Sequence, residues 1–186
     1  MAREFKYAAA QFDLFKVIHL DEDMCLKLLQ ECRALTLKAL EEDHKKCLAD
    51  LVTYQDLLIE LETKRTELFI LNEDTEDIEY QIMDVQGQEM QTEEKCKAYA
   101  EADFNPPPTG IISYGNTVLL QREDKTFLVG TIVDERIADA SIGALSGNSP
   151  IGAALLHVAY IGTPGRQTIT AKSRGDSKTY RIWRII

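Results

Sequence analysis

Residues 21–70 contain neither glycine nor proline, so no strong helix breaker interrupts this stretch of the chain. Leucine, glutamate, lysine and alanine, which all favour helices, dominate it. One set of positions recurs at spacings of three and four, which predicts a helix that packs along a coiled-coil seam. The seam positions are Leu37, Leu40, His44, Cys47, Leu51, Tyr54, Leu58, Leu61, Arg65 and Leu68. A long helix of this kind needs a second helix beside it.

A second run with the same spacing follows a polar break at residues 72–75. Its seam positions are Ile78, Ile82, Val85, Glu89, Thr92, Cys96 and Tyr99. Two helical runs joined by a short polar turn predict an antiparallel hairpin, with arms of about 40 Å at a rise of 1.5 Å per residue. A coiled-coil stalk that dimerises the protein would have the same periodicity, and the pattern alone leaves both interpretations open.

Residues 1–36 form an additional segment at the start of the helical region. The first helix is expected to be longer than the second, so its N-terminal part needs other cover. Residues 1–19, which hold a cluster of apolar and aromatic side chains, would supply that cover by folding back. Self-association through the N-terminal helices would supply it equally well, and the sequence does not choose between the two.

A proline-rich segment at residues 105–110, Asn-Pro-Pro-Pro-Thr-Gly, divides the chain because proline cannot continue a helix. The charge changes sign at the same place: residues 1–104 carry a net charge of −13 and residues 105–186 one of +3. We therefore expect a helical domain over residues 1–104, a stiff linker, and a second domain over residues 111–186. The overall net charge of −10 disfavours a protein that mainly coats nucleic acid.

Four short strand-like runs, bounded by turn residues, make the second domain β-rich. They cover residues 111–120, 126–133, 167–172 and 178–186. Between the second and third runs, Ser149 is placed to cap a helix that begins at Pro150. The expected fold class is therefore α+β. An antiparallel coiled-coil helical hairpin precedes a small antiparallel β-domain with one short helix.

The sequence also narrows the class of protein. No apolar run approaches the ~18 residues that a membrane-spanning helix needs, and the N-terminus is a poor secretory signal. The four cysteines have no Cys-x-x-Cys spacing, which favours reduced thiols in a cytoplasmic protein. No Ser/His/Asp or Cys/His arrangement, Walker loop or nucleotide fingerprint is present. We therefore expect neither a membrane partner nor a free-standing enzyme.

The turn between the two helical runs holds five carboxylates within seven residues. They are Glu73, Asp74, Glu76, Asp77 and Glu79. A helix start, where acids complement the dipole, explains two or three of them but not five, because like charges this close repel one another. Such a cluster is tolerable when it meets a cation, and Mg²⁺ prefers carboxylate ligands. No histidine or cysteine is nearby, which argues against zinc. A solvated loop remains the alternative to a metal-binding turn.

Several short motifs follow one another in the second domain. They are Tyr114-Gly115-Asn116-Thr117-Val118, Val129-Gly130, Ser149-Pro150-Ile151-Gly152, Ala154-Leu155-Leu156 and Tyr180-Arg181-Ile182. In this order and spacing, residues 111–186 resemble the C-terminal domain of the bacterial Gre transcript-cleavage factors. The resemblance implies an FKBP-like domain that docks at the rim of the secondary channel of RNA polymerase. It implies a partner-binding role for Ser149, Pro150, Ile151, Gly152 and Leu155.

The resemblance extends to the acidic turn, because residues 72–80 lie where the family has the tip of its hairpin. Glu73 matches the family's first tip carboxylate in charge, and Glu76 matches the second in identity. The resemblance therefore implies that Glu73 and Glu76 are the catalytic carboxylates. They would act on a Mg²⁺ shared with the polymerase active site, with Asp74 and Asp77 as further metal ligands, and would reach nascent RNA only inside the elongation complex.

Two tip positions depart from the family pattern: Asn72 replaces a glycine, and Asp77 replaces an asparagine. The second change makes the tip more acidic, as in Gre-like paralogues that inhibit polymerase. Three hypotheses follow. The protein stimulates cleavage of backtracked RNA by polymerase, it inhibits polymerase through its over-acidic tip, or it is a non-catalytic adaptor that uses the Gre-type domain for docking.

Overall fold

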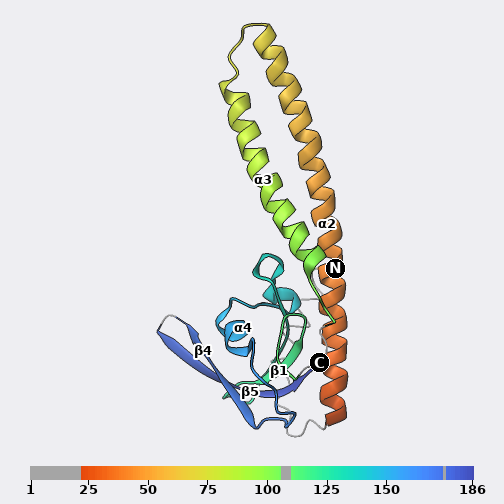
Figure 1. Ribbon diagram of the computed structural model, residues 1–186, viewed down its shortest axis with the longest axis vertical. Coiled ribbons are helices and arrows are strands. Elements are labelled where there is room, and N and C mark those ends of the chain that lie inside the picture. The colour runs from red at the N-terminus through yellow and green to blue at the C-terminus, as the bar shows by residue number, and fades with distance from the viewer. Residues whose placement is uncertain (1–21, 106–109, 174) are drawn as a thin grey trace. The chain divides into compact units, whose positions relative to one another are not determined.

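The computed structural model describes residues 22–105, 110–173 and 175–186 (Figure 1). The expectations for residues 1–19 and for most of the proline-rich linker lie outside these ranges. The chain divides into two units. We call residues 41–101 the hairpin unit, and the described residues up to Leu40 together with those from Ala102 onward the sheet unit. The sequence placed the boundary at the linker instead, with all of residues 1–104 in the helical domain.

The hairpin unit is built from two helices. Helix α2 spans Glu22–Ile70 and contributes its residues from Glu41 onward, and helix α3 spans Glu76–Glu101. Toward the turn, Leu61, Ile78, Ile82 and Val85 form a buried cluster. Three partly buried seam residues pack against that cluster: Tyr54, Leu58 and Leu68. These residues are the ones that the three-and-four spacing selected, so the predicted antiparallel hairpin is confirmed.

Farther from the turn, polar side chains also link the two helices. Lys95 Nζ donates a hydrogen bond of 2.7 Å to Asp43 Oδ2, and the Tyr99 hydroxyl donates to the same oxygen. Partial burial works to raise the pKa of Asp43, but the hydrogen bonds from Lys95 and Tyr99 outweigh it and hold that pKa below its usual value. The rings of His44 and Tyr99 stack with their centroids 5.0 Å apart. Side-chain polar contacts therefore join the two arms at this level.

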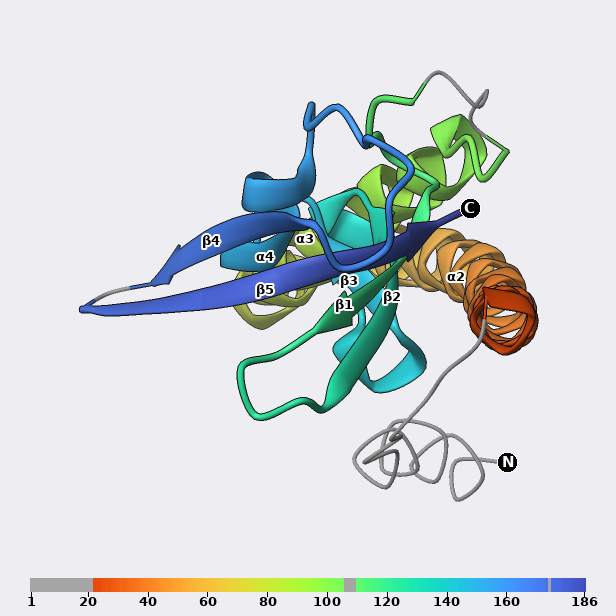
Figure 2. The same ribbon diagram turned by 90° about the horizontal axis from the view of Figure 1, so that it is seen from below.

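The sheet unit contains one five-stranded sheet in the order β3-β2-β1-β5-β4 (Figure 2). The strands are β1 (Thr117–Gln121), β2 (Phe127–Val133), β3 (Ala144–Ser146), β4 (Gln167–Ser173) and β5 (Asp176–Ile185). The four longer strands pair antiparallel, as predicted, and helix α4 (Pro150–Leu155) begins where the sequence placed it. The α+β class is confirmed, and the short helices η2 (Glu135–Ile137) and η3 (Ala140–Ile142) lead into β3.

Two details of the sheet differ from the sequence prediction. Strand β3 pairs parallel to β2, so the sheet is mixed rather than purely antiparallel. Strand β1 begins at Thr117 rather than at residue 111, because a turn precedes it. In this turn the Asn116 Oδ1 atom accepts a hydrogen bond of 2.9 Å from the Ser113 N–H, and Gly115 has a φ of 84°. Strand β3 was not predicted because its three residues are too few to show a periodic pattern in the sequence.

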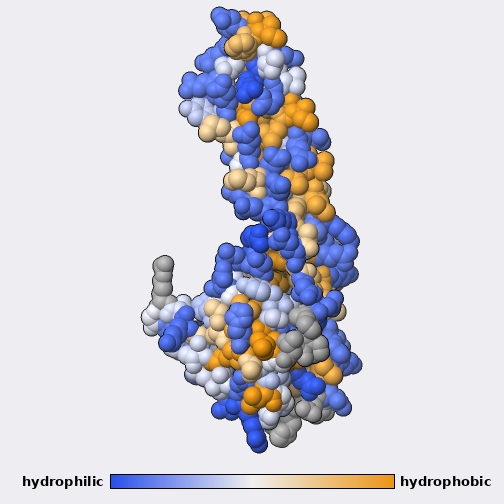
Figure 3. Space-filling model, in the orientation of Figure 1, coloured by the Kyte–Doolittle hydropathy of each residue, from blue (hydrophilic) through white to orange (hydrophobic). Residues whose placement is uncertain are grey.

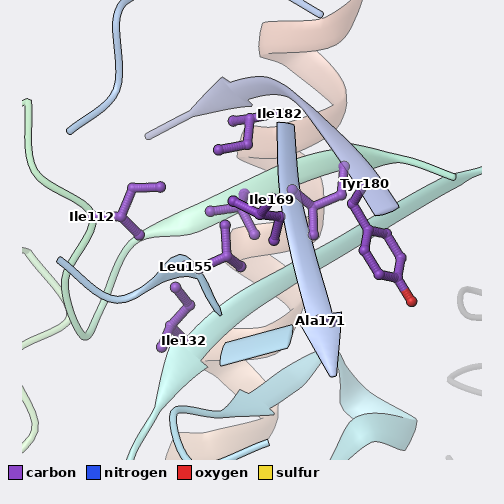
Figure 4. Close-up of a cluster of buried hydrophobic side chains, with 9 residues drawn as sticks. Ile112, Ile132, Leu155, Ile169, Ala171, Tyr180 and Ile182 are labelled. Carbon is purple, nitrogen blue, oxygen red and sulfur yellow. The ribbon is translucent and has the colours of Figure 1, made fainter. Parts of the chain in front are cut away.

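One face of the sheet packs on α4. The side chains of Leu155, Ile112 and Ile132 meet those of β4 and β5 in a single apolar cluster (Figure 4). Val118, Leu120 and Ile182 belong to the same cluster and are completely buried. Alternate residues of β1 therefore point toward α4, as expected for a strand with one face on a helix.

The opposite face of the sheet packs on the beginning of α2. Leu119 and Phe127 are buried against Cys25 and Leu29, and Leu29 has no exposed surface. The Thr36 hydroxyl adds a hydrogen bond of 2.8 Å to the Ile142 carbonyl. The sheet face thus covers the N-terminal part of the long helix. The sequence analysis had offered residues 1–19 or self-association as the source of this cover. Strand β1 is buried on both faces for the same reason.

No helix in the described part of the chain combines the length and the apolar character that crossing a membrane requires.

Candidate functional site

The acidic turn starts with a well-defined helix end. The Glu73 N–H donates to the Leu68 carbonyl at 2.9 Å, and the Asn72 N–H donates to the Phe69 carbonyl at 3.1 Å. Asn72 itself has a φ of 57°, in the left-handed region. This is the Schellman arrangement, whose left-handed position takes glycine first and asparagine second. The structure therefore explains how asparagine can occupy position 72, and the hydrogen bond to Leu68 fixes the backbone of Glu73.

The second helix starts with equal definition. The Asp74 Oδ1 atom accepts a hydrogen bond of 3.0 Å from the Glu76 N–H, which would otherwise lack a partner at the helix start. The Thr75 hydroxyl donates to Glu79 Oε1 at 3.1 Å, and the Thr75 carbonyl accepts the Glu79 N–H at 3.0 Å. Glu76, Asp77 and Glu79 occupy the first turn of α3, where the helix dipole favours acids. Asp74 thus has a capping role as well as its charge.

All five carboxylate residues of the turn are exposed to solvent. In the described residues, no three histidine, cysteine or acidic side chains come together as a group that could hold a metal ion. The donor chemistry of the turn suits Mg²⁺, but its geometry does not enclose one. Mg²⁺ commonly takes only one or two protein carboxylates and fills its remaining positions with water or phosphate oxygens. The turn can therefore offer Glu73 and Glu76 to an ion whose other ligands come from elsewhere.

Sequence reasoning missed an apolar surface beside the acids. Phe69 and Ile70 at the end of α2, and Leu71 directly after it, are 78%, 74% and 65% exposed. Hydrophobic surface is visible at the turn end of the hairpin unit (Figure 3). Contiguous exposed apolar side chains commonly mark a surface that another molecule covers. The signal available in the sequence was an apolar triplet that lies outside the seam and directly before the polar turn. We call these three residues the apolar tip.

The left-handed turn leads to a stability prediction. Asn72→Gly should leave the free energy of unfolding of the hairpin unchanged or raise it, because glycine adopts this conformation without strain. Asn72→Val should lower it by about 1–2 kcal/mol, since a β-branched residue is strained at a positive φ. Urea unfolding followed by circular dichroism measures both. Equal stability of the two variants would contradict the assigned turn.

The Ser-Pro-Ile-Gly motif of the sheet unit has a structural role. The Ser149 Oγ atom donates to the Ser146 carbonyl at 2.6 Å and accepts the Gly152 N–H at 3.1 Å, so Ser149 caps α4 as predicted. Gly152 lies directly against the preceding loop, where an added Cβ would come within 2.1 Å of the Ser146 carbonyl oxygen. Leu155 belongs to the apolar cluster and has no exposed surface.

The five residues with an expected partner-binding role differ in their exposure. Gly152 and Leu155 are buried, so they shape this part of the sheet unit, and their expected contact with a partner stays a prediction. Pro150 is exposed, and Ser149 and Ile151 are half-buried. These three residues therefore present more surface to solvent than Gly152 and Leu155 do.

The close approach at Gly152 gives a matched pair of glycine substitutions. Gly152→Ala should lower the free energy of unfolding by about 1–3 kcal/mol, because a backbone oxygen must move to admit the new methyl group. Gly87→Ala should instead raise it by about 0.5–1 kcal/mol, since that glycine lies inside α3 with open space around it. Thermal unfolding of the full chain checks both signs. A neutral Gly152→Ala variant would refute the packing described for the motif.

No protein-family model matches this sequence, and no curated protein matches it either. Solved structures that are similar to it include the following two. The transcription factor Gfh1 is 18% identical, with 76% of this chain and 92% of that chain covered and a TM-score of 0.33. The prokaryotic transcription elongation factor GreA/GreB from Nitrosomonas europaea is 22% identical, with 60% and 93% covered and a TM-score of 0.33.

Proposed function

We propose that this protein is a transcription elongation factor of the Gre type, which binds RNA polymerase and stimulates cleavage of backtracked RNA. The observation that carries the proposal is the acidic turn: five exposed carboxylates end a two-helix hairpin, in a chain whose other unit has the Gre-type motifs. In this proposal the protein acts in the cytoplasm and has no activity alone.

The acidic turn would work by offering carboxylates from a backbone that is already held in place. A Mg²⁺ shared with the polymerase active site would supply Lewis acidity and an activated water for phosphoryl transfer. Glu73 follows the Schellman turn directly, and the Glu76 N–H is held by the Asp74 carboxylate. Both backbones are therefore fixed before binding, which lowers the entropy that must be lost when the two carboxylates are positioned. Asp77 adds a further negative charge on the first turn of α3.

Two surfaces would provide binding. On the sheet unit, exposed Pro150 and half-buried Ile151 and Ser149 offer a contact that the buried part of the motif holds in shape. On the hairpin unit, the apolar tip would lie against a protein wall and lose its exposure to water on binding. Nascent RNA would be met only within the complex with polymerase.

One observation favours inhibition as a second candidate function. Asp77 is exposed beside Glu76 and has a carboxylate where the family has an amide. A surplus acid would draw the shared ion away from the geometry that cleavage needs, while the hairpin blocks the path of the incoming nucleotide. The same surface and the same partner would then give the opposite outcome.

The test adds the full chain to a stalled, backtracked elongation complex and follows the RNA 3′ end. Shortening of the RNA from its 3′ end supports the elongation-factor proposal, and slower nucleotide addition without cleavage supports inhibition. Binding to polymerase with neither effect would leave only an adaptor role. Absence of binding would reject all three.

A further inference from the structure

Two cysteines face each other across the seam of the hairpin unit. The Sγ atoms of Cys47 in α2 and Cys96 in α3 are 2.7 Å apart. Only 5% of Cys47 and 7% of Cys96 is exposed. The Cys47 thiol also lies 3.4 Å from the Thr92 carbonyl, to which it donates. Contacts on both sides thus hold the Cys47 sulfur in front of Cys96.

The meeting of the two thiols is not explained by packing alone. A single buried cysteine behaves as a small apolar side chain and needs no special account. Facing seam positions in a coiled coil are usually filled by larger apolar residues such as leucine, which close the gap between the helices. Here both positions have cysteine at the same level. Both cysteines are free thiols in the structure.

We propose that Cys47 and Cys96 are a reversible redox pair, which forms a disulfide that joins the two arms of the hairpin. A disulfide bond needs its sulfurs about 2.05 Å apart, and the observed separation is close enough for small side-chain movements to reach it. The proposal concerns the hairpin itself and does not depend on the proposed function.

A small-molecule disulfide such as glutathione disulfide is the oxidant. The thiolate of one cysteine attacks a sulfur of that disulfide, which forms a mixed disulfide and releases one small thiolate. The thiolate of the second cysteine then attacks the protein sulfur of the mixed disulfide. This step forms the Cys47–Cys96 bond and releases the second small thiolate. The protein pair loses two electrons and two protons, and the small disulfide gains them and becomes two small thiols.

Burial controls how fast the exchange runs. It raises the pKa of Cys47 to about 12, and the neighbouring Cys96 thiol adds to this rise. Because the thiolate is the attacking species, the closed hairpin reacts slowly, and exchange proceeds when the arms separate locally. The completed bond then closes a loop that contains the acidic turn. A cross-link of this kind reduces the freedom of the unfolded hairpin and stabilises the folded one.

The experiment incubates the full chain with glutathione disulfide and reduced glutathione at graded ratios, blocks free thiols by alkylation, and maps the peptides by mass. We expect one product, lighter by two hydrogens, in which the peptides of Cys47 and Cys96 are joined. Its thermal unfolding midpoint should exceed that of the reduced protein by several degrees, and dithiothreitol should reverse both changes.

Two variants complete the design. Cys32→Ser removes a half-buried thiol of the sheet unit and should form the cross-link as the natural chain does. Cys47→Ala should form none and should show no change in unfolding midpoint on oxidation. If glutathione stays attached to Cys47 or Cys96, if another pair forms, or if both thiols remain free at every ratio, the proposal is overturned. Peptide mapping of the natural chain alone distinguishes these outcomes, whether or not Cys47→Ala folds.

Discussion

Glu76→Gln should reduce RNA cleavage in the backtracked complex by about two orders of magnitude or more, while binding to polymerase persists. Glutamine keeps the size of the side chain but removes the charge that a hard cation requires. Glu76 is exposed and its N–H is held by Asp74, so the substitution should leave the fold intact. Gel analysis of the RNA 3′ end measures cleavage, and co-migration with polymerase measures binding.

Two further variants make this result specific. Glu94→Gln changes the same chemistry at an exposed position of α3 away from the turn, and cleavage should stay within about twofold, because screened surface charges act over roughly 10 Å or less. Asp77→Asn replaces the surplus acid with an amide of similar size. If the natural protein inhibits through its surplus acid, this change should weaken the inhibition and expose cleavage. Equal loss in Glu76→Gln and Glu94→Gln would show that total charge, rather than the tip, determines activity.

Leu29→Ala should lower the free energy of unfolding of the sheet unit by about 2–5 kcal/mol, the range for removing a fully buried leucine. Leu29 contacts Leu119 and Phe127 on the face of the sheet that α4 does not cover. Denaturant unfolding measures this change when it is followed by the fluorescence of Trp183. Because Trp183 packs on the same cluster, its fluorescence reports the unfolding of that cluster.

Leu35→Ala is the matched control, because Leu35 lies on the same helix but is 46% exposed. Leu35→Ala should lower the free energy of unfolding by about 0.5 kcal/mol or less. If both substitutions lower the free energy of unfolding by the same small amount, residues 22–40 do not belong to the sheet unit.

The same packing determines how fragments must be designed. A fragment of residues 105–186 alone would leave Leu119 and Phe127 uncovered, so it lacks part of its own core.

The sequence could predict the hairpin because its signal is local. The seam residues repeat along each helix, and burial follows that repeat in both arms, as Leu61 in α2 and Ile82 in α3 illustrate. The cap of α4 was predictable for the same reason, because Ser149 and Pro150 act within one turn. In contrast, the short parallel strand β3 and the cover that α2 gives the sheet depend on residues far apart in the chain.

The candidate site was predictable in part. The acidic residues and their place in a turn followed from the sequence, and the structure adds the hydrogen bonds that fix Glu73 and Glu76. The motif residues were harder to interpret, because a distinctive pattern does not say whether its side chains face outward or inward. Gly152 is distinctive because a backbone oxygen lies against it, and Leu155 because it fills the core. The apolar tip was overlooked because its residues lie outside the seam.

Helix α2 belongs to both units, and this has a consequence for the lifetimes of its hydrogen bonds. Amide protons exchange with solvent when the segment that holds them opens, and each cooperative segment opens with its own free energy. Residues up to Leu40 should exchange together with strand β1, which is buried on both faces. Residues from Glu41 onward should exchange together with α3. One continuous helix should therefore show two rates of isotope uptake, with the change near Leu40 and no break in its backbone.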